Sequence, residues 1–233
     1  MRQHWSDLLF LHWEVPAEII EATLPPGLEV DTFAGKAYLG LVPFTMSGVR
    51  PIGFPSIPWI SNFHEVNVRT YVHFAGRDPG VWFYSLDAAN PVAVWLAQTT
   101  FHLPYKWARM SMQYQQATGG VIDYSSSRRN SKTGASCRIR YLPTGSPTHA
   151  VPGTLSFFLL ERYLLYAFGR GQLHQVRVHH RSYPVQEAEL LDCQEDLLAS
   201  AGFERPDHPP LIHYASGVDV EVFPLRSVDQ SSW

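Results

Sequence analysis

Apolar and polar residues alternate with a period of two along much of the chain, and glycines and prolines separate the alternating runs. A period of two places successive side chains on opposite faces of a β-strand. The pattern therefore predicts many strands, and the turn signals at 33–36 and 76–80 favour antiparallel pairing. The predicted strands cover 28–33, 36–49, 62–74, 80–88, 108–117, 120–128, 135–142, 163–168, 172–180, 187–193 and 218–225.

Helix signals are confined to a few short segments. Asn90 and Thr154 are suited to cap helix N-termini, and Gly202 is suited to end a helix. The predicted helices cover 16–25, 90–98, 153–163 and 193–202. Neither repeats nor a linker interrupt the chain, so we predict a single domain over residues 1–233. The expected fold class is mainly β (α+β), one large antiparallel sheet, curled or closed, with helices at its margin.

Composition and charge exclude several classes of protein. The net charge is -3, and the only basic cluster is the short stretch 128–132, so we expect no nucleic-acid partner. The two cysteines, Cys137 and Cys193, are far apart, which argues against a disulfide framework or a zinc cluster. Charged residues interrupt the most apolar stretch, 155–168, so we expect no membrane partner and a cytoplasmic location. A homo-oligomer is compatible with the sequence.

Sequence motifs for common cofactors are absent. The chain has no phosphate loop, no dinucleotide fingerprint, no Gly-x-Ser-x-Gly and no His-Glu-x-x-His. Adjacent His179 and His180 face opposite sides of their predicted strand, which argues against joint metal ligation. We therefore predict neither a metal nor a cofactor.

The strand 62–74 carries the most informative pattern. One face holds Phe63, Glu65, Asn67, Arg69 and Tyr71, and the opposite face holds mainly β-branched residues. The β-branched face is suited to a core. The polar face is either solvated or lines a polar cavity inside a curled sheet, where a few convergent polar groups are typical of a small-molecule site.

A lysine lies between two aromatic residues in the stretch FHLPYKWARM, 101–110. Lys106 either extends its stem along Tyr105 and Trp107 with its ammonium in solvent, or enters a pocket as an amine for chemistry. The bend after Pro104 decides which side of the strand Lys106 faces, so both interpretations stay open.

A charged pair, Glu161 and Arg162, ends the predicted helix 153–163. The simpler interpretation is that Arg162 satisfies the carbonyls at the helix C-terminus while Glu161 pairs with it or with another cation. The alternative is that one of the two points into the cavity.

An ordered series of motifs resembles the DUF2071 (YqjF-like) family over nearly the whole chain. The motifs are LLFLHWEVP, LPPGLEVDTFAGKAYLGLVPFTM, FHEVNVRTYV, VWFYSLDA, FHLPYKWARM and ERYLLY. That family is grouped with the acetoacetate decarboxylase-like superfamily. The resemblance implies a closed, cone-shaped antiparallel β-barrel with an internal pocket.

The resemblance also implies roles for individual residues. In the decarboxylases a lysine in a motif similar to Pro-Lys-Lys forms a Schiff base with a β-keto acid. Here the motif reads Pro104, Tyr105, Lys106, so Tyr105 holds the place of that lysine and Lys106 the place of its companion. Glu65 is similar to a pocket glutamate of the decarboxylases, and Arg69 follows on the same face.

Two main functional hypotheses follow. The first is a lyase-type enzyme (decarboxylase, aldol or dehydratase) acting on a small carbonyl or carboxylate compound. Its catalytic residues would be Lys106, Glu65 and Tyr105, and its substrate-binding residues Arg69, Asn67, Tyr71 and Phe63. The second is a non-catalytic protein that binds a small organic acid in the same cavity. A sheet-mediated assembly protein is a third interpretation, with less support because no long apolar edge is evident.

Overall fold

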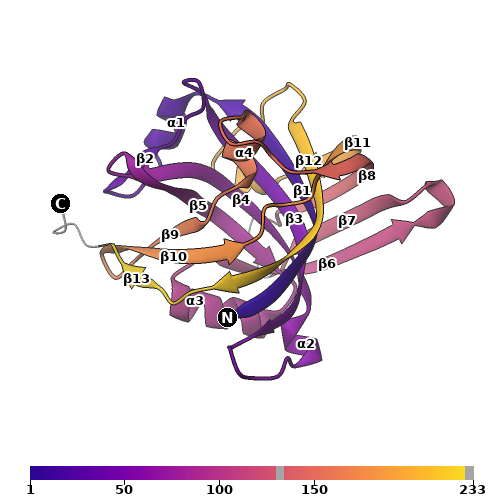
Figure 1. Cartoon of the computed structure of the whole chain (residues 1–233), viewed down its shortest axis with the longest axis horizontal. Helices are drawn as coiled ribbons and strands as arrows, with labels where there is room; N and C mark the ends of the chain where they lie inside the picture. Colours follow the sequence, from indigo (N-terminus) through magenta and orange to yellow (C-terminus); the bar gives the residue numbers. More distant parts are fainter. Residues whose placement is uncertain (130–133, 229–233) are drawn as a thin grey trace.

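The structure, a computed structural model, describes residues 1–129 and 134–228, and it is dominated by β-strands (Figure 1). These residues form thirteen strands, five α-helices and one 3-10 helix. The strands are β1 (Arg2–Val15), β2 (Leu28–Val30), β3 (Ala37–Arg50), β4 (Phe63–Phe74), β5 (Arg77–Ala88), β6 (Tyr105–Gln115), β7 (Val121–Arg128), β8 (Ser136–Thr148), β9 (Leu164–Gly169), β10 (Gln172–His180), β11 (Val185–Glu195), β12 (Leu211–Val222) and β13 (Arg226–Ser227). The prediction of a mainly β fold with one large sheet is confirmed.

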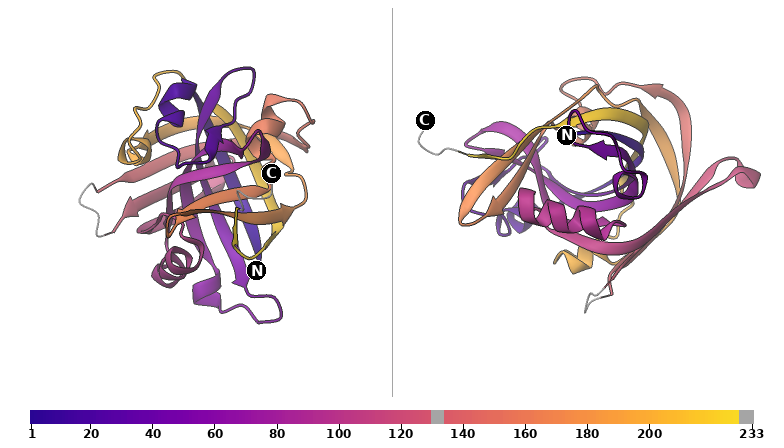
Figure 2. Two further views of the ribbon diagram at one scale, coloured as in Figure 1. Left: turned by 90° about the vertical axis from the view of Figure 1, so that its left-hand side faces the viewer. Right: turned by 90° about the horizontal axis from the view of Figure 1, so that it is seen from below.

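The strands join into one sheet in the order β13-β10-β9-β5-β6-β7-β8-β11-β12-β1-β3-β4-β2, with further pairings of β10 to β12 and β5 to β4. The pairings therefore lead from β4 through β3, β1 and the following strands to β5, and from β5 back to β4. The view from below in Figure 2 shows how strongly the sheet curves. Its strands bend round one side of the molecule and return on the other.

Most pairings are antiparallel, but β5 pairs in parallel with β6 and with β9. A parallel pair needs a crossover connection, and helix α3 (Pro91–Phe101) provides it between β5 and β6. The Asn90 side chain accepts hydrogen bonds from the backbone N–H groups of Val92 (2.9 Å) and Ala93 (3.1 Å), which confirms the predicted N-cap. Because α3 connects two strands that pair in parallel, it lies beside the sheet between the end of β5 and the start of β6.

The other helices are short. They are α1 (Ala17–Glu21), α2 (Pro58–Ser61), α4 (Leu155–Leu160) and α5 (Leu197–Ser200). Thr154 caps α4 as predicted, since its Oγ1 accepts from the backbone N–H of Phe157. The predicted helix 193–202 is too long, because its first three residues belong to β11. Helix α2 was not predicted; Pro58 stands at its start. Among the residues that the structure describes, no helix is both long and apolar enough to cross a membrane.

Two large hydrophobic clusters lie on opposite faces of β1, β3 and β4. The first, here called the cavity cluster, includes Leu8, Phe10, Tyr38, Val42, Phe44, Met46, Phe63 and Tyr71. The second, here called the packed cluster, includes Leu9, Leu11, Trp13, Leu39, Leu41, Val66 and Val68. Over residues 8–15 of β1 and 37–46 of β3, the even-numbered cluster members belong to the cavity cluster and the odd-numbered ones to the packed cluster, as strand pleating requires. A register shift lies between Ser6 and Leu11 of β1, and odd-numbered Trp5 packs against the cavity cluster. The central strands are therefore buried on both faces.

Candidate functional site

A cavity of about 160 Å³ lies within the cavity cluster. Its walls are almost entirely apolar. They are formed by strands that face each other across the cavity and by α3. The apolar lining includes Leu8, Val42, Phe44, Met46, Phe63, Phe83, Leu86, Ala93, Leu96, Ala97, Phe101, Leu103, Leu165, Val176, Val178 and Val222. The polar side chains of the lining are those of Gln3, Glu65, Asn67, Arg69, Tyr105 and Tyr183, with the indole of Trp5. The site is thus a small apolar chamber with a few polar groups.

Strand β4 supplies the charged groups of the cavity. Phe63, Glu65, Asn67 and Arg69 share its inner face and all line the chamber. The sequence left open whether this polar face is solvated or encloses a cavity, and the structure places it around the cavity. The opposite, β-branched face packs into the packed cluster.

Glu65 is the most deeply buried ionisable group of the cavity, with 1% of its surface exposed. The hydroxyl of Tyr105 donates a hydrogen bond to its Oε2 at 2.7 Å. Burial raises the pKa of Glu65 to about 8, against the opposing effect of hydrogen bonds from Tyr105 and Asn67. The negative charge of Asp87 raises this pKa further. At neutral pH the carboxyl group of Glu65 is therefore mostly protonated.

Tyr105 is buried against the same carboxyl group. Burial, followed by the neighbouring Glu65, raises the pKa of its hydroxyl well above the ordinary value. The hydroxyl consequently stays a neutral hydrogen-bond donor. Tyr105 and Glu65 form a fixed pair that joins β6 to β4.

Asn67 lines the chamber and contains a buried acceptor without a partner among the described residues. Its side chain is 4% exposed, and its Oδ1 has no hydrogen-bond partner among the described residues. A buried polar atom without a partner loses solvation that no protein contact replaces. A hydrogen-bond donor on a molecule in the cavity would satisfy this oxygen.

Arg69 is held by aromatic rings and by a backbone carbonyl. Its guanidinium carbon lies 5.5 Å from the ring centroid of Phe10 and 5.7 Å from that of Tyr71. Its Nη2 donates to Tyr71 Oη and to the carbonyl of Leu159, both at 3.3 Å. Its buried Nε has no partner among the described residues. The guanidinium is thus positioned at one edge and retains an unused donor.

Gly40 makes room for this arginine. It is the β3 residue directly opposite Arg69 in the register of the sheet. A methyl group added at Gly40 would lie 3.2 Å from Arg69 Cγ and 3.2 Å from His12 Cδ2. The absence of a side chain at this position therefore allows Arg69 and His12 to share one inner face.

Tyr71 lies behind Arg69 and is not part of the cavity lining. Its hydroxyl donates to the carbonyl of Leu159 at 2.7 Å, and it contacts His12 Nε2 at 2.6 Å. Because the hydroxyl proton is already donated, His12 Nε2 carries a proton and donates to Tyr71. Tyr71 was predicted to bind substrate; its side chain lies outside the lining and contacts Arg69 and His12.

Lys106 lies outside the chamber. Strand alternation turns Tyr105 inward and Lys106 outward, where its side chain is exposed, and it stands opposite Asp87 in the sheet. This position counts against the interpretation of Lys106 as a pocket amine. No lysine of the described residues contributes to the lining.

Glu161 and Arg162 bind different partners and do not form the predicted ion pair with each other. Arg162 does satisfy the helix end, since its Nε donates to the carbonyl of Phe158 at 2.7 Å, but its ion pair is with Asp31. Glu161 accepts hydrogen bonds from the Tyr163 hydroxyl and the Tyr183 backbone N–H. Neither side chain lines the cavity.

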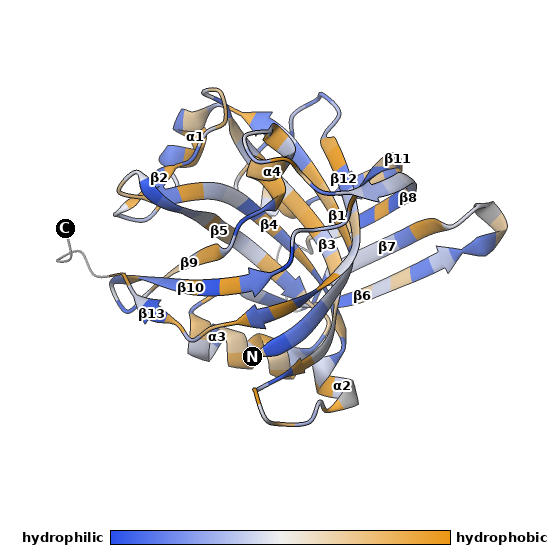
Figure 3. Cartoon of the chain, viewed as in Figure 1, coloured by the Kyte–Doolittle hydropathy of each residue, from blue (hydrophilic) through white to orange (hydrophobic). Residues whose placement is uncertain are grey.

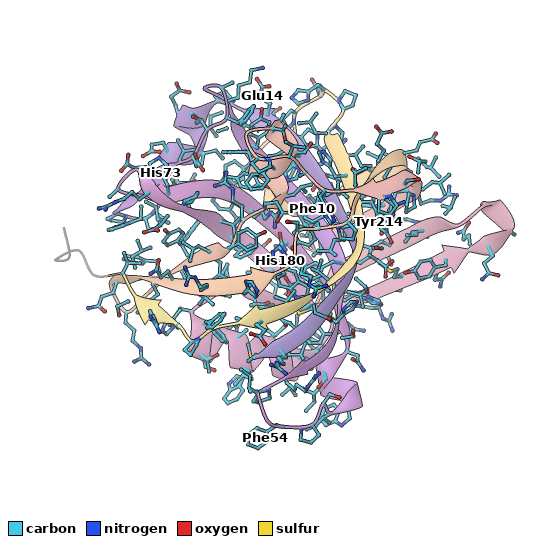
Figure 4. All side chains as sticks on the ribbon, in the orientation of Figure 1. Phe10, Glu14, Phe54, His73, His180 and Tyr214 are labelled. Carbon is cyan, nitrogen blue, oxygen red and sulfur yellow. The ribbon has the colours of Figure 1, made fainter. Side chains whose placement is uncertain are left out.

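Two contributions to the chamber were missed in the sequence. Tyr183 lies between β10 and β11, where no alternation marks it, and α3, predicted as a helix over 90–98 at the margin of the sheet, was not expected to line the cavity. Helix α3 has no charged residue, and its colouring in Figure 3 ranges from apolar orange to pale grey. Figure 4 shows Phe10 and His180 at the densely packed centre of the molecule and Phe54 at the end of a loop far from them.

The described part of the chain contains no candidate metal-binding site. No group of three or more His, Cys, Asp or Glu side chains there is arranged to hold an ion. The residues of the cavity offer hydrogen bonds, one guanidinium and one protonated carboxyl group.

Solved structures with the same fold include enzymes of the acetoacetate decarboxylase type. The enduracididine biosynthesis enzyme MppR, complexed with the condensation product of pyruvate and imidazole 4-carboxaldehyde, aligns with a TM-score of 0.69 and 14% identity over 99% of this chain and 90% of its own. An acetoacetate decarboxylase-like enzyme from Sphingomonas wittichii RW1 aligns with a TM-score of 0.65 and 13% identity over 98% and 92%. The TM-scores show a shared fold, and at such low identities the similarity shows the fold alone.

Sequence comparison identifies the family as well as the fold. The model of DUF2071, described as an uncharacterized conserved protein, matches residues 2–219. The uncharacterized protein YqjF of Bacillus subtilis (strain 168) is 40% identical over 226 residues, which cover 97% of this chain and 91% of YqjF. From a match of this extent we conclude that the protein belongs to the DUF2071 family, and its fold is that of the solved acetoacetate decarboxylase-like enzymes.

Proposed function

We propose that this protein binds a small carbonyl or carboxylate compound in the cavity without a covalent bond to the chain. The observation that carries the proposal is the enclosed row Glu65, Asn67 and Arg69 in a chamber that is otherwise apolar. Polar groups are seldom buried without partners unless they serve a ligand or a structural network. Here the Nε donor of Arg69 has no partner among the described residues and is of the kind that binds a carbonyl or carboxylate oxygen.

The charge of the chamber supports a carbonyl or carboxylate oxygen as the bound group. Glu65 is mostly protonated at neutral pH, so it can donate a hydrogen bond and does not repel an anion. Arg69 supplies a positive charge and planar donors, which suit a carboxylate. Together the two residues would bind an organic acid more strongly than an amine.

The lack of a lysine in the described lining argues against a Schiff base. Tyr105 faces the chamber and Lys106 faces solvent, so the position where the decarboxylases would have their nucleophile carries a phenol. A phenol with a strongly raised pKa is a poor nucleophile at neutral pH. Non-covalent binding is therefore the function that we favour.

A second candidate is a lyase-type enzyme that uses acid–base chemistry alone. One observation favours it: the pKa of Glu65, raised to about 8, lies near neutrality, where a group exchanges protons efficiently. In such a reaction Glu65 would transfer the proton, Tyr105 would donate to the developing negative charge, and Arg69 would hold the carboxylate. The solved complexes of MppR with pyruvate and with a condensation product of pyruvate make carbonyl compounds sensible first substrates.

We also propose that the sheet is a closed, cone-shaped barrel around this site, in a single domain. The continuous pairings from β4 round to β5 support this architecture. A closed sheet has few free edges and surrounds its interior with side chains from alternate positions. That arrangement would exclude water from Glu65 and thereby maintain its raised pKa.

The test is ligand-dependent thermal stabilisation combined with borohydride reduction. A panel of carboxylic and keto acids should raise the melting temperature of the protein, while borohydride and mass mapping should trap no adduct. Glu65→Gln and Arg69→Met should abolish or reduce the stabilisation, and Lys106→Ala should leave it unchanged. A reduced adduct on a lysine would contradict the non-covalent proposal, and no stabilisation by any acid or carbonyl compound would contradict binding altogether.

A further inference from the structure

We infer that the ligand is a monocarboxylic acid whose body is apolar and about as large as a benzene ring, rather than a short polar keto acid. This inference rests on the proposed function, since it concerns the same cavity. It adds the chemical class of the ligand. The argument uses the distribution of polar groups, the volume of the chamber and the surroundings of α3.

The polar groups of β4 occupy one wall of the chamber. Most of the remaining lining is aliphatic or aromatic, and α3 contributes Ala93, Leu96, Ala97 and Phe101 to it without any charged side chain. A short polar acid such as acetoacetate would leave this apolar surface without a complementary contact. A ligand with a polar head at Arg69 and Glu65 and an apolar body would fill both parts.

The volume sets the size of that body. The chamber measures about 160 Å³. An engineered apolar cavity of roughly 150 Å³, in another protein, stays dry and binds benzene. A phenyl ring or a chain of about six carbons is therefore the appropriate size. A much longer chain would require the walls to move.

The charges select the head group. The only side chains of the lining that carry a full charge or can acquire one near neutral pH are Glu65 and Arg69. With the Glu65 carboxyl mostly protonated, the guanidinium of Arg69 has no counter-ion among the described residues. Arg69 is half-buried, and a partly desolvated cation gains from an anionic partner, so a carboxylate is favoured over an alcohol or an amine.

The surface beside α3 is also apolar. Leu96 both lines the chamber and is 47% exposed, so the chamber reaches the surface at this helix. Trp95 is exposed on the same helix. Trp59 is also exposed, and its carbonyl accepts a hydrogen bond from the Nδ2 of Asn90, the residue that caps this helix. Figure 1 shows α3 at the margin of the sheet, close to α2. An apolar ligand would contact apolar side chains from the entrance inward.

The test is isothermal titration calorimetry with straight-chain acids from acetate to decanoate, together with phenylacetate, pyruvate and acetoacetate. Affinity should rise roughly fourfold for each added methylene up to about six carbons and then level off or fall. Phenylacetate should bind about as tightly as hexanoate. Hexan-1-ol and hexylamine, which match hexanoate in body but not in head, should bind at least tenfold more weakly.

Two variants locate the apolar end. Ala97→Phe, inside the chamber, should weaken hexanoate at least tenfold while changing acetate little. Ala93→Leu is a second, milder filling of the same space, used if the phenylalanine disturbs folding. Thr99→Phe adds the same ring to the exposed side of α3, away from the lining, and should leave hexanoate binding unchanged.

The outcomes separate this inference from the proposed function. If pyruvate or acetoacetate binds as tightly as hexanoate, the apolar body is wrong but the carboxylate site remains. If hexan-1-ol matches hexanoate, the acidic head is wrong. If no acid or carbonyl compound of any length binds, both the inference and the proposed function fail.

Discussion

The two faces of β1, β3 and β4 differ in packing: one is closely packed and the other lines a cavity. On one face the packed cluster joins Leu11, Leu39, Leu41, Val66 and Val68, each of which has no exposed surface. On the other face the cavity cluster is interrupted by a row of polar side chains and by an open chamber. The sheet is therefore closely packed with aliphatic side chains on one side and carries Glu65, Asn67 and Arg69 around a chamber on the other. Buried polar atoms without a partner among the described residues occur on both faces, for example Asn67 Oδ1 and Ser85 Oγ.

This difference shows how a β-fold can tolerate a buried Glu, Asn and Arg in a single strand. Such a row lowers stability, because each group loses water and not all of them gain partners. On the reverse face of β4 the alternate residues Val66 and Val68 supply apolar burial in the packed cluster. We expect stability to depend mainly on the packed face and ligand binding mainly on the cavity face.

The largest expected effect comes from a matched pair of leucine truncations. Leu41→Ala, in the packed cluster, should lower the free energy of unfolding by about 3–5 kcal/mol, since it leaves a void in a closely packed region. Leu86→Ala, at the wall of the chamber, should cost at least about 1 kcal/mol less, because that side chain already borders open space. Urea unfolding measures both, and equal losses would break the distinction between the two faces.

The second effect concerns the pH dependence of stability through Glu65. Its folded pKa of about 8 lies above the ordinary value of 4.5, so the folded state retains a proton that the unfolded state releases. Stability from this group is fully present below pH 4.5 and is lost as the pH rises towards 8, by at most about 1.4 kcal/mol per pH unit. Glu65→Gln keeps the side chain neutral, so its stability should lack this decline.

The measurement is the difference in unfolding free energy between the parent protein and Glu65→Gln across this pH range. The difference isolates Glu65 from the other titrating groups, including Asp87 and the histidines. It should favour the variant increasingly from pH 4.5 to 8 and then become constant. A difference that does not change with pH would show that burial does not raise the pKa of Glu65.

Arg69 should produce the third effect, on binding. Arg69→Met keeps much of the apolar stem but removes the cation, and it should weaken carboxylate binding by about 10- to 100-fold, as expected for a charge-assisted hydrogen bond of about 1.5–3 kcal/mol. Arg69→Lys keeps the charge without the planar donors and should give an intermediate affinity. Calorimetry with hexanoate measures both variants. Unchanged affinity in Arg69→Met would contradict the binding of the ligand carboxylate by the charge of Arg69.

Local signals in the sequence predicted much of this fold correctly. The caps at Asn90 and Thr154 depend only on neighbouring residues, and both were found. The shared face of Glu65, Asn67 and Arg69 follows from strand alternation alone. These features required no knowledge of distant contacts.

Features that depend on long-range packing were harder to predict. Strand β1 was missed because it is buried on both faces, so Leu8, Leu9, Phe10 and Leu11 form a continuous apolar run without alternation. The wall formed by α3 and Tyr183 depends on elements far apart in the chain. Whether the polar face of β4 met water or a chamber likewise depended on the curvature of the whole sheet.

The orientation of one dipeptide separates the two functional hypotheses, and it gives the smallest predicted effect. Tyr105 and Lys106 are neighbours on β6, but only Tyr105 reaches the chamber. Lys106→Ala should change the free energy of unfolding by less than about 0.5 kcal/mol, as expected for an exposed side chain, and should not change hexanoate affinity. Tyr105→Phe is the matched inner variant, and it should weaken binding because Glu65 loses its hydroxyl donor. A loss of binding or of lyase activity in Lys106→Ala that exceeds the loss in Tyr105→Phe would mean that β6 presents its other face to the ligand, and would restore the lysine as a candidate nucleophile.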